Sequence, residues 1–467
     1  MRKNWKKYMA LCLSMSMVLA AAPNMIAAEN SGSTVSGGAV SSGGAIEESP
    51  APTATATPTP YIDMEANRLA APTTVTARGG SKRVRLEWSA VSGANGYYIY
   101  YREASASEYT KAAIIANGTQ TSYVKKSLAQ NAQYYFYVVP FKVVQGVTVE
   151  GALSKAVSAK TASVAATSKT AKKYSTKAKF QKSAAYKKYT KMKSNMNYSK
   201  SFAIPGAKQT NVAGFGCQTM VPQGMCLAGS NFLITAYDAK GVDYSVIYVV
   251  SRASKSYLTT IVLPSKAKVG GIAYDGKNIW ISKGKAVASF PASVVTDAVN
   301  SGSSYYELSA YNSVHTMNGT AAYMGYYNNV LWVGSFSQSS STMYGYQVGK
   351  TTVPTLTQKY KMAVPSKTQG ITFDKNGTMI LTRSYRTNAS KSGYISQMRT
   401  YMPSYVNVSA DGTIKKNAAL KVTTLPPMAE GVAIYNTYTY TLFSSAYYKS
   451  CKYPMDRVIA MKTNKLI

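Results

Sequence analysis

Five short segments of this chain start an apolar stretch with a glycine, and a polar residue precedes most of these glycines. The residue pairs are Gln223-Gly224, Gly270-Gly271, Asn318-Gly319, Gln369-Gly370 and Glu430-Gly431. Amide and carboxylate oxygens bind sugar hydroxyls, and they are also the ligands that Ca²⁺ and Mg²⁺ prefer. If the fold gathers these segments, their side chains form a polar ring that contains one carboxylate. The alternative is that they hydrogen-bond only water and backbone.

The chain contains a single histidine, His315, which limits the metal sites and catalytic relays that it can form. Zinc sites built on several histidines are excluded, and a Ser-His-Asp relay would have to use this one residue. His315 precedes the third of the five segments, so we expect it at the mouth of the same ring. Asp238 and Asp243 stand in a turn without the spacing of a calcium loop, and we interpret them as turn formers. The sequence has no nucleotide-phosphate loop.

The spacing of the five glycines indicates which elements must position these side chains. The glycines recur roughly 47, 48, 51 and 61 residues apart, close to the period of a β-propeller blade. Strand-like segments that end in an apolar residue and proline, such as 257–264, 360–365 and 420–426, precede glycine-led segments. The fold class is therefore all-β, with a five-bladed propeller predicted over residues 198–467. Six blades remain an alternative if residues 291–311 or 396–413 contain another.

The two ends of this region predict that the ring of blades closes. The last strand-like segment, 457–461, has no outer strand after it, whereas 198–205 resembles an outer strand without a blade of its own. The early strand would complete the last blade and leave no open sheet edge. We therefore expect Phe202 to pair with the strand that contains Ile459. The inner strands would then bring the polar residues to the central channel.

The repeat pattern resembles NHL-repeat and gluconolactonase-like propellers. Gluconolactonase-like enzymes use a Glu with Asn and Asp ligands at one mouth of the channel. The resemblance implies such a role for Glu430 and Asn318, which match in kind, but no Asp accompanies them. It therefore implies a divalent cation at the axis only weakly, and no cofactor is predicted.

Residues 70–161 change to short alternating strands separated by glycine-rich turns. Trp88, the Gly-Tyr-x-Ile run 96–99 and the spacing from Leu128 to Tyr134 resemble a fibronectin type III module. The resemblance implies a β-sandwich in which the Tyr134 hydroxyl bonds back to the backbone. It also implies the role of a spacer or platform.

The N-terminus indicates export. Residues 1–28 combine a basic head with a short apolar stretch and small residues before Ala28, which is typical of a cleaved signal peptide. Residues 29–66 are a Ser/Gly-rich and then Pro/Thr-rich linker, predicted to be disordered. Of the 4 cysteines, Cys217, Cys226 and Cys451 follow the signal. This odd number leaves at least one thiol free or bound to another chain, and a bridge between Cys217 and Cys226 stays open. We expect no transmembrane anchor.

The formal net charge is +35, and its distribution is uneven. No acidic residue occurs between Glu150 and Asp238, while about thirteen lysines lie between Lys155 and Lys200. We interpret residues 162–197 as a Lys/Ala-rich linker that attracts polyanions. The lysines expected to bind them are Lys172, Lys173, Lys177, Lys179, Lys187, Lys188, Lys191 and Lys193.

Two functional hypotheses follow. The first is a secreted, cell-wall-associated binding or scaffold protein of a Gram-positive bacterium. Its partner would be an anionic wall polymer, a glycan, or a protein on the propeller face, and the 39 tyrosines favour sugar contacts. The ligand would meet the channel ring of Gln223, Asn318, Gln369, Glu430 and His315. The alternative is a hydrolase or lactonase with Glu430 as base or metal ligand. Export argues against a specific nucleic acid.

Overall fold

The computed structural model describes residues 62–161, 174–206, 217, 219–303, 305–385, 395–403, 411–413, 418–448 and 450–467. The chain divides into two compact units, 1–61 and 62–467, and all described residues belong to the second. The predicted signal peptide, most of the predicted linker 29–66, Lys172 and Lys173 lie outside the described residues. Every helix within the described ranges is too short or too polar to span a membrane.

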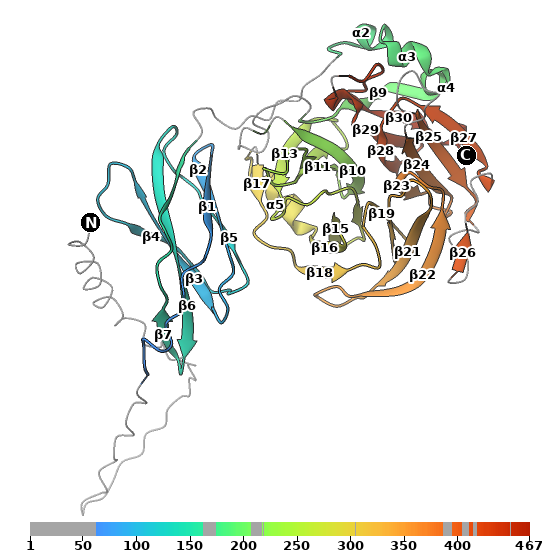
Figure 1. Cartoon of the computed structure of the whole chain (residues 1–467). Coiled ribbons are helices and arrows are strands. Elements are labelled where there is room, and N and C mark those ends of the chain that lie inside the picture. Colours follow the sequence, from blue (N-terminus) through green and yellow to red (C-terminus); the bar gives the residue numbers. More distant parts are fainter. Residues whose placement is uncertain are drawn as a thin grey trace, which may run out of the picture. The chain divides into compact units, whose positions relative to one another are not determined.

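Residues 75–160 form two antiparallel sheets (Figure 1). The first has the order β1 (Val75–Gly80), β2 (Arg83–Trp88), β5 (Ser122–Lys125). The second has the order β4 (Thr110–Ile115), β3 (Gly96–Glu103), β6 (Gln133–Val144), β7 (Val147–Glu150), with β8 (Val157–Lys160) also paired to β6.

Side chains from both sheets share one core, in which Val84, Leu86 and Phe136 are buried and Trp88 is 6% exposed. Alternation along β2 and β6 directs every second side chain into this core. The Tyr134 hydroxyl accepts a hydrogen bond of 2.9 Å from the backbone N–H of Ala129. The strand order and this contact confirm the fibronectin type III-like sandwich.

The described residues from 196 onward form five further sheets, labelled I to V. Sheet I has the order β10 (Met220–Ala228), β11 (Asn231–Asp238), β12 (Val246–Ser251), β13 (Tyr257–Val262), β17 (Tyr305–Glu307). Sheet II has the order β14 (Ile272–Tyr274), β15 (Asn278–Lys283), β16 (Ala286–Pro291), β18 (Ser313–Thr316). Sheet III has the order β19 (Tyr323–Tyr327), β20 (Val330–Gly334), β21 (Ser341–Val348), β22 (Leu356–Val364), β26 (Asp411–Thr413).

The remaining two sheets have four strands each. Sheet IV has the order β23 (Thr368–Phe373), β24 (Met379–Tyr385), β25 (Ile395–Tyr401), β27 (Lys421–Leu425). Sheet V has the order β28 (Ala429–Tyr435), β29 (Tyr438–Phe443), β30 (Arg457–Lys462), β9 (Met196–Ala203). The segments 291–311 and 396–413 contribute α5 (Ser293–Asn300) and strands of sheets I, III and IV. The described residues from 196 onward therefore give five sheets.

The first strands of the five sheets contact one another in cyclic order: β10, β14, β19, β23, β28 and again β10. In Figure 1 the sheets follow one another from green at β10 to red at β30. Backbones approach closely along this cycle. A Cβ atom added to Gly431, for example, would lie 2.5 Å from the Met225 backbone nitrogen. A Cβ on Gly370 would lie 2.7 Å from the Glu430 carbonyl oxygen. Only glycine fits at such contacts.

Strand β9 comes from the N-terminal end of this region and pairs with β30, the third strand of sheet V. Phe202 lies opposite Val458, beside a register shift that includes Ile459. The Phe202 ring packs 4.9 Å from Phe232 of sheet I and 6.4 Å from Tyr440 of sheet V. The pairing predicted for the two ends of the region is therefore present.

The third glycine-led segment is an exception to the predicted pattern. Asn318-Gly319 was expected to open an inner strand, but that prediction was wrong because β19 begins at Tyr323. Tyr323 pairs with Gly334, whereas in sheet II Gly271 lies across from Ser282 and donates its N–H to the serine hydroxyl. In sheet III the glycine therefore stands on the second strand instead of the first.

Residues 174–195 belong to the predicted Lys/Ala-rich basic linker. They form three short helices, α2 (Lys177–Gln181), α3 (Ala184–Lys188) and α4 (Thr190–Asn195). Thr176 and Ser183 cap the first two by accepting backbone N–H bonds. Phe180, Ala185 and Met192 are fully buried in the core that includes sheet V. The boundary predicted at residue 197 therefore falls inside a packed region.

The sandwich contacts sheet I through ion pairs that the sequence did not predict. Arg83 and Arg85 of β2 both pair with Glu307 of β17. Arg78 of β1 pairs with Asp243 at 2.8 Å. The ring of Tyr305 lies 3.5 Å from the guanidinium carbon of Arg83. Arg83, Arg85 and Glu307 are buried together, so each of these charges retains a close partner of opposite sign, whereas Arg78 is partly exposed.

Candidate functional site

The helices α2 to α4 carry a dense group of exposed positive charges, which we call the basic face. It is defined by the six exposed lysines Lys177, Lys179, Lys187, Lys188, Lys191 and Lys193. All six belong to the predicted polyanion-binding set. The opposite side of the same helices is apolar and buried, as Phe180 and Met192 show. The charges are therefore displayed on a packed surface.

No acidic side chain can neutralise the basic face from its own segment, since none occurs between Glu150 and Asp238. Lys193 lies 5.7 Å from the ring of Tyr186. Neighbouring like charges repel, and a bound polyanion relieves that repulsion. Phosphate and carboxylate groups are the natural partners of such a surface.

A second group of polar residues forms around Glu430, where β28 bulges between Ala429 and Val432. β10 and β23 bulge at the corresponding Gln-Gly steps. A bulge inserts one extra residue and re-aims its side chain. The Glu430 carboxyl accepts a bond of 2.8 Å from the Ser444 hydroxyl and also hydrogen-bonds the Gln223 side chain. The structure thus brings together two of the predicted ring residues.

Glu430 is only 6% exposed. Burial raises the pKa of its carboxyl to about 7, although the bonds from Ser444 and Gln223 and the charge of Lys268 act in the opposite direction. The Tyr237 pKa is also raised, by burial first and by the Glu430 charge second. Lys268 lies 5.3 Å from the Tyr237 ring. Glu430 thus has the acidity of a general base or acid at neutral pH.

Of the other predicted ring residues, Gln369 lies on β23, which contacts the strand of Glu430, whereas Asn318 and His315 lie elsewhere. Gln369 is half-buried in β23. Asn318 donates to the Gln358 side chain at 2.6 Å, and Gln358 belongs to β22, the fourth strand of sheet III. Asn318 therefore lies beside an outer strand, contrary to the expectation that it faces the channel. The residue that precedes the close-contact position is Gln369 in sheet IV and Glu430 in sheet V. In sheet III the residue before Tyr323 is Ala322.

His315 also lies at an outer position. It belongs to β18, the fourth strand of sheet II, whereas a loop at the channel mouth was expected. Its Nε2 atom is 2.9 Å from the Pro354 carbonyl oxygen and 3.2 Å from the Ser313 hydroxyl. Its ring lies 6.0 Å from that of Trp280. These contacts fit a structural role between neighbouring sheets.

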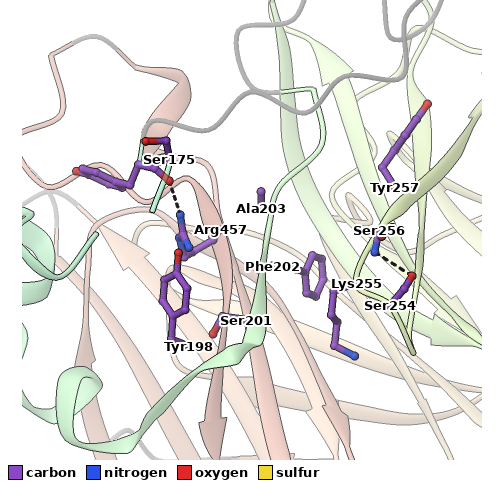
Figure 2. A pocket seen from close by; sticks show the side chains of 11 residues that line it. Ser175, Tyr198, Ser201, Phe202, Ala203, Ser254, Lys255, Ser256, Tyr257 and Arg457 are labelled. Atoms are coloured by element: carbon purple, nitrogen blue, oxygen red, sulfur yellow. Dashed lines mark hydrogen bonds between the residues drawn. The ribbon is translucent and has the colours of Figure 1, made fainter. Parts of the chain in front are cut away.

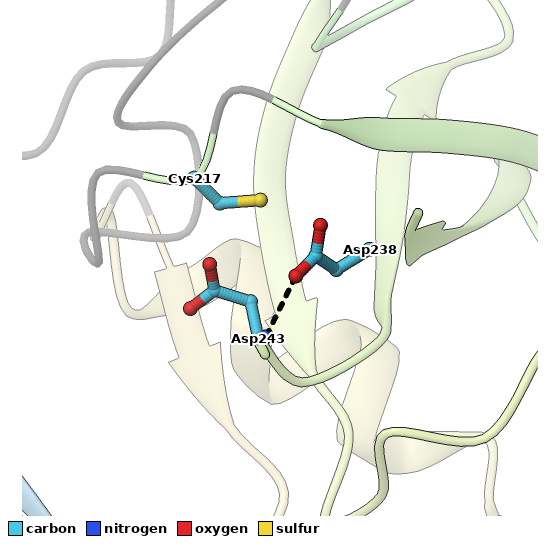
Figure 3. A group of neighbouring side chains, drawn as sticks. All are labelled: Cys217, Asp238 and Asp243. Carbon is cyan, nitrogen blue, oxygen red and sulfur yellow. Dashed lines mark hydrogen bonds between the residues drawn. The ribbon is translucent and has the colours of Figure 1, made fainter. Parts of the chain in front are cut away.

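Cys217, Asp238 and Asp243 approach one another closely enough to be tested as a metal site (Figure 3). The Asp238 carboxylate accepts backbone N–H bonds from Lys240, Val242 and Asp243, which is the turn-forming role predicted for it. Asp243 is paired with Arg78. A cation would have to displace these donors, so the residues present do not fit a metal site. None of the three cysteines of the described residues forms a disulfide.

Comparison with known proteins identifies no family for the whole chain. No family model matches it, and no curated protein matches it. The chain is similar over part of its length to solved structures of fibronectin type III domains. A Fn3-like protein from Clostridium thermocellum is 28% identical, covering 21% of this chain and 96% of that one, with a TM-score of 0.17.

Two further structures give similar values. The protein FN3tt is 23% identical, covering 21% of this chain and 97% of that one, with a TM-score of 0.17. The third fibronectin III domain of human KIAA0343 is 18% identical, covering 25% of this chain and 98% of that one, with a TM-score of 0.19. In each of these three cases the matched part is a quarter of the chain or less.

Proposed function

We propose that this chain is a secreted bacterial surface protein that binds anionic wall polymers or glycans through the basic face. The single observation that carries the proposal is the packing of α2 to α4. Their apolar side is buried against sheets IV and V, and six lysines remain exposed on the other side. A linker that only tethered the protein would not require fully buried Phe180 and Met192.

The proposal includes the architecture of the C-terminal region, which we infer to be a five-bladed β-propeller. Five antiparallel sheets, cyclic contacts between their first strands, and completion of the last sheet by β9 support this inference. In such a ring the basic face covers the outside of the last two blades, because α4 contacts β27 and β30. The fibronectin-like sandwich is held to the first blade by the pairs of Arg83 and Arg85 with Glu307. The propeller would present the ligand-binding surfaces, and the signal peptide predicted at residues 1–28 supports export.

The binding should be electrostatic and therefore dependent on salt. Each lysine near an anionic surface contributes about 1 kcal/mol, and physiological salt screens charges beyond about 8 Å. Six such contacts together retain a protein on a polymer without recognising its sequence. We expect release from isolated Gram-positive cell walls at moderate salt.

The test compares two variants with the same change in charge. In the first, the six lysines of the basic face are replaced by glutamine. In the second, six exposed lysines on sheets II to IV are replaced: Lys285, Lys350, Lys359, Lys361, Lys375 and Lys421. Binding to isolated walls and to soluble polyglycerol phosphate is measured at low and moderate salt. The first variant should lose at least tenfold in affinity and the control much less. Equal losses in both, or binding that resists salt, would overturn the proposal.

The second candidate function is hydrolysis of a lactone or glycan with Glu430 as base. Its raised pKa, to about 7, and its bond with Ser444 favour this candidate. Glycoside hydrolysis needs a second carboxyl group, and Asp456, the nearest in sequence, is paired with Arg457 at 2.8 Å. Whether Glu430 is a catalytic base is tested by measuring the turnover of a panel of lactones and glycans by the wild type and by Glu430→Gln. Absence of turnover, or equal rates, would remove Glu430 as a catalyst.

A further inference from the structure

A pocket of about 460 Å³ lies where sheet V meets sheet I (Figure 2). β9 and β30 supply one part of its lining, the turn between β12 and β13 supplies another, and Tyr174 and Ser175 precede α2. Its volume falls within the range of about 300–1,000 Å³ that is typical of small-ligand sites. None of its residues was among the binding residues predicted from sequence.

Aromatic side chains from both sheets line this pocket. Tyr198 comes from β9 of sheet V and Tyr257 from β13 of sheet I, and both are partly exposed. The Tyr257 hydroxyl is hydrogen-bonded to that of Thr260 at 2.5 Å, which fixes the orientation of its ring. Tyrosine rings at a half-exposed site offer apolar faces and hydroxyl groups together. Such a lining suits the ring of a sugar.

The positive charge at the pocket comes from Lys255. Burial lowers its pKa, and the nearby charges of Lys200 and Arg252 lower it further; no carboxylate contributes. Lys255 also has a left-handed backbone, with φ of 61°. This region is uncommon for a residue other than glycine and often accompanies function. Its ammonium group donates to the Arg252 carbonyl oxygen in the same turn.

The other cation in the lining, Arg457, is already neutralised. Its Nε atom donates to the Asp456 carboxylate at 2.8 Å, and a second nitrogen donates to the Tyr174 carbonyl oxygen at 3.0 Å. Its guanidinium group lies 4.6 Å from the Phe180 ring and 4.9 Å from the Tyr198 ring. Arg457 therefore holds the pocket wall. The Lys255 ammonium group lies 5.3 Å from the Phe232 ring, and no carboxylate of the described residues forms an ion pair with it.

We propose that this pocket binds one anionic sugar unit, with its ring against Tyr198 and its phosphate or carboxylate group at Lys255. The inference rests on the proposed function, because it assigns a defined subsite to the same class of ligand. The basic face supplies attraction along a polymer, and the pocket supplies recognition of a single unit. A ligand here contacts both sheet V and sheet I, so it should also stabilise the contact between them.

Glucose 6-phosphate, glucuronate and glucose are the probes, titrated into the full chain by calorimetry and NMR. The wild type should bind the two charged sugars at least tenfold more tightly than glucose, and the stronger of the two identifies the preferred anion. Lys255→Gln should remove this preference, whereas Lys255→Arg should retain it. Tyr198→Ala should weaken all three. Saturating charged sugar should raise the Tm of the wild type.

Equal binding of glucose and the charged sugars, or no binding of any of them, would overturn the proposal even if Lys255→Gln did not fold. A preference for charged sugars that survives in folded Lys255→Gln would also overturn it. The variant with six glutamines on the basic face separates the two proposals. It should bind the charged sugars normally while losing the polymer. If polymer binding never depends on the basic face, the proposed function fails, and the sugar titrations still decide the pocket.

Discussion

The Tyr323 side chain occupies the space above Gly334, its partner across the first two strands of sheet III. A Cβ on Gly334 would lie 2.0 Å from the Tyr323 Cζ atom. Sheet II has the reverse arrangement, in which Gly271 on the first strand donates its N–H to the Ser282 hydroxyl on the second at 2.8 Å. At this paired position the glycine is therefore on the first strand in sheet II (Gly271) and on the second strand in sheet III (Gly334).

Gly334→Ser should therefore destabilise the protein. The added side chain must displace the fully buried Tyr323, and overpacking of this kind costs about 1–3 kcal/mol. The double variant Tyr323→Gly/Gly334→Ser reproduces the sheet II arrangement and should recover part of the loss. Chemical denaturation of the two single variants and the double variant measures the coupling. Strictly additive changes would mean that the two positions do not compensate each other.

This exchange explains why the sequence misplaced the third strand. Gly224, Gly370 and Gly431 lie within the inner strands β10, β23 and β28, and neighbouring backbones approach each of them closely. In sheet III the glycine of this contact is Gly334, on the second strand. The sequence pattern therefore pointed to Gly319 as the start of the first strand, which was wrong. Asn318 was assigned to the channel for the same reason. Which of the two paired positions carries the glycine depends on the pairing between the strands. That pairing cannot be read from a single sequence.

The sandwich and the β9 pairing were predictable because local signals carry them. Alternating apolar residues and the spacing from Leu128 to Tyr134 identify the sandwich. The packing of α2 to α4 was not predictable from helical periodicity. Each helix is too short to show a stripe, and single residues such as Phe180 and Met192 provide the buried contacts. The pocket at Lys255 combines residues from distant segments, so no local motif marks it.

Phe202 should make a large contribution to the packing between sheets V and I. It is 4% exposed and packs against Phe232 and Tyr440. Phe202→Ala should cost about 3–5 kcal/mol, as is usual for a large buried ring. Phe336, which is 37% exposed, is the matched control, and its replacement by alanine should change stability little. Equal effects in urea denaturation would show that the closing strand contributes little to stability.

Glu307 should control the docking of the sandwich on sheet I. In Glu307→Gln the neutral amide replaces the carboxylate, so Arg83 and Arg85 stay buried without their negatively charged partner. Breaking such a buried ion pair costs about 3–5 kcal/mol when the cation stays buried. Undocking relieves that cost, so we expect the sandwich to melt in a separate calorimetric transition. Glu87→Gln is the control, since Glu87 pairs with the exposed Lys266 at 3.2 Å, and such pairs contribute about 0–1 kcal/mol. A single unchanged transition in Glu307→Gln would contradict this role.

Glu430 should make stability depend on pH in the direction opposite to that of a salt-bridged carboxylate. Its pKa rises from 4.5 to about 7 on folding because burial disfavours the charged form. The folded state therefore binds more protons between these values, and stability falls as pH rises from 4.5 to 7, by about 3 kcal/mol in total. Glu430→Gln should remove this loss, so the variant gains on the wild type above pH 4.5. Ser444→Ala, which deletes the bond to the carboxylate, should extend the fall to higher pH. A difference between Glu430→Gln and wild type that stays constant across this range, measured by denaturation at each pH, would show that water reaches the carboxyl group.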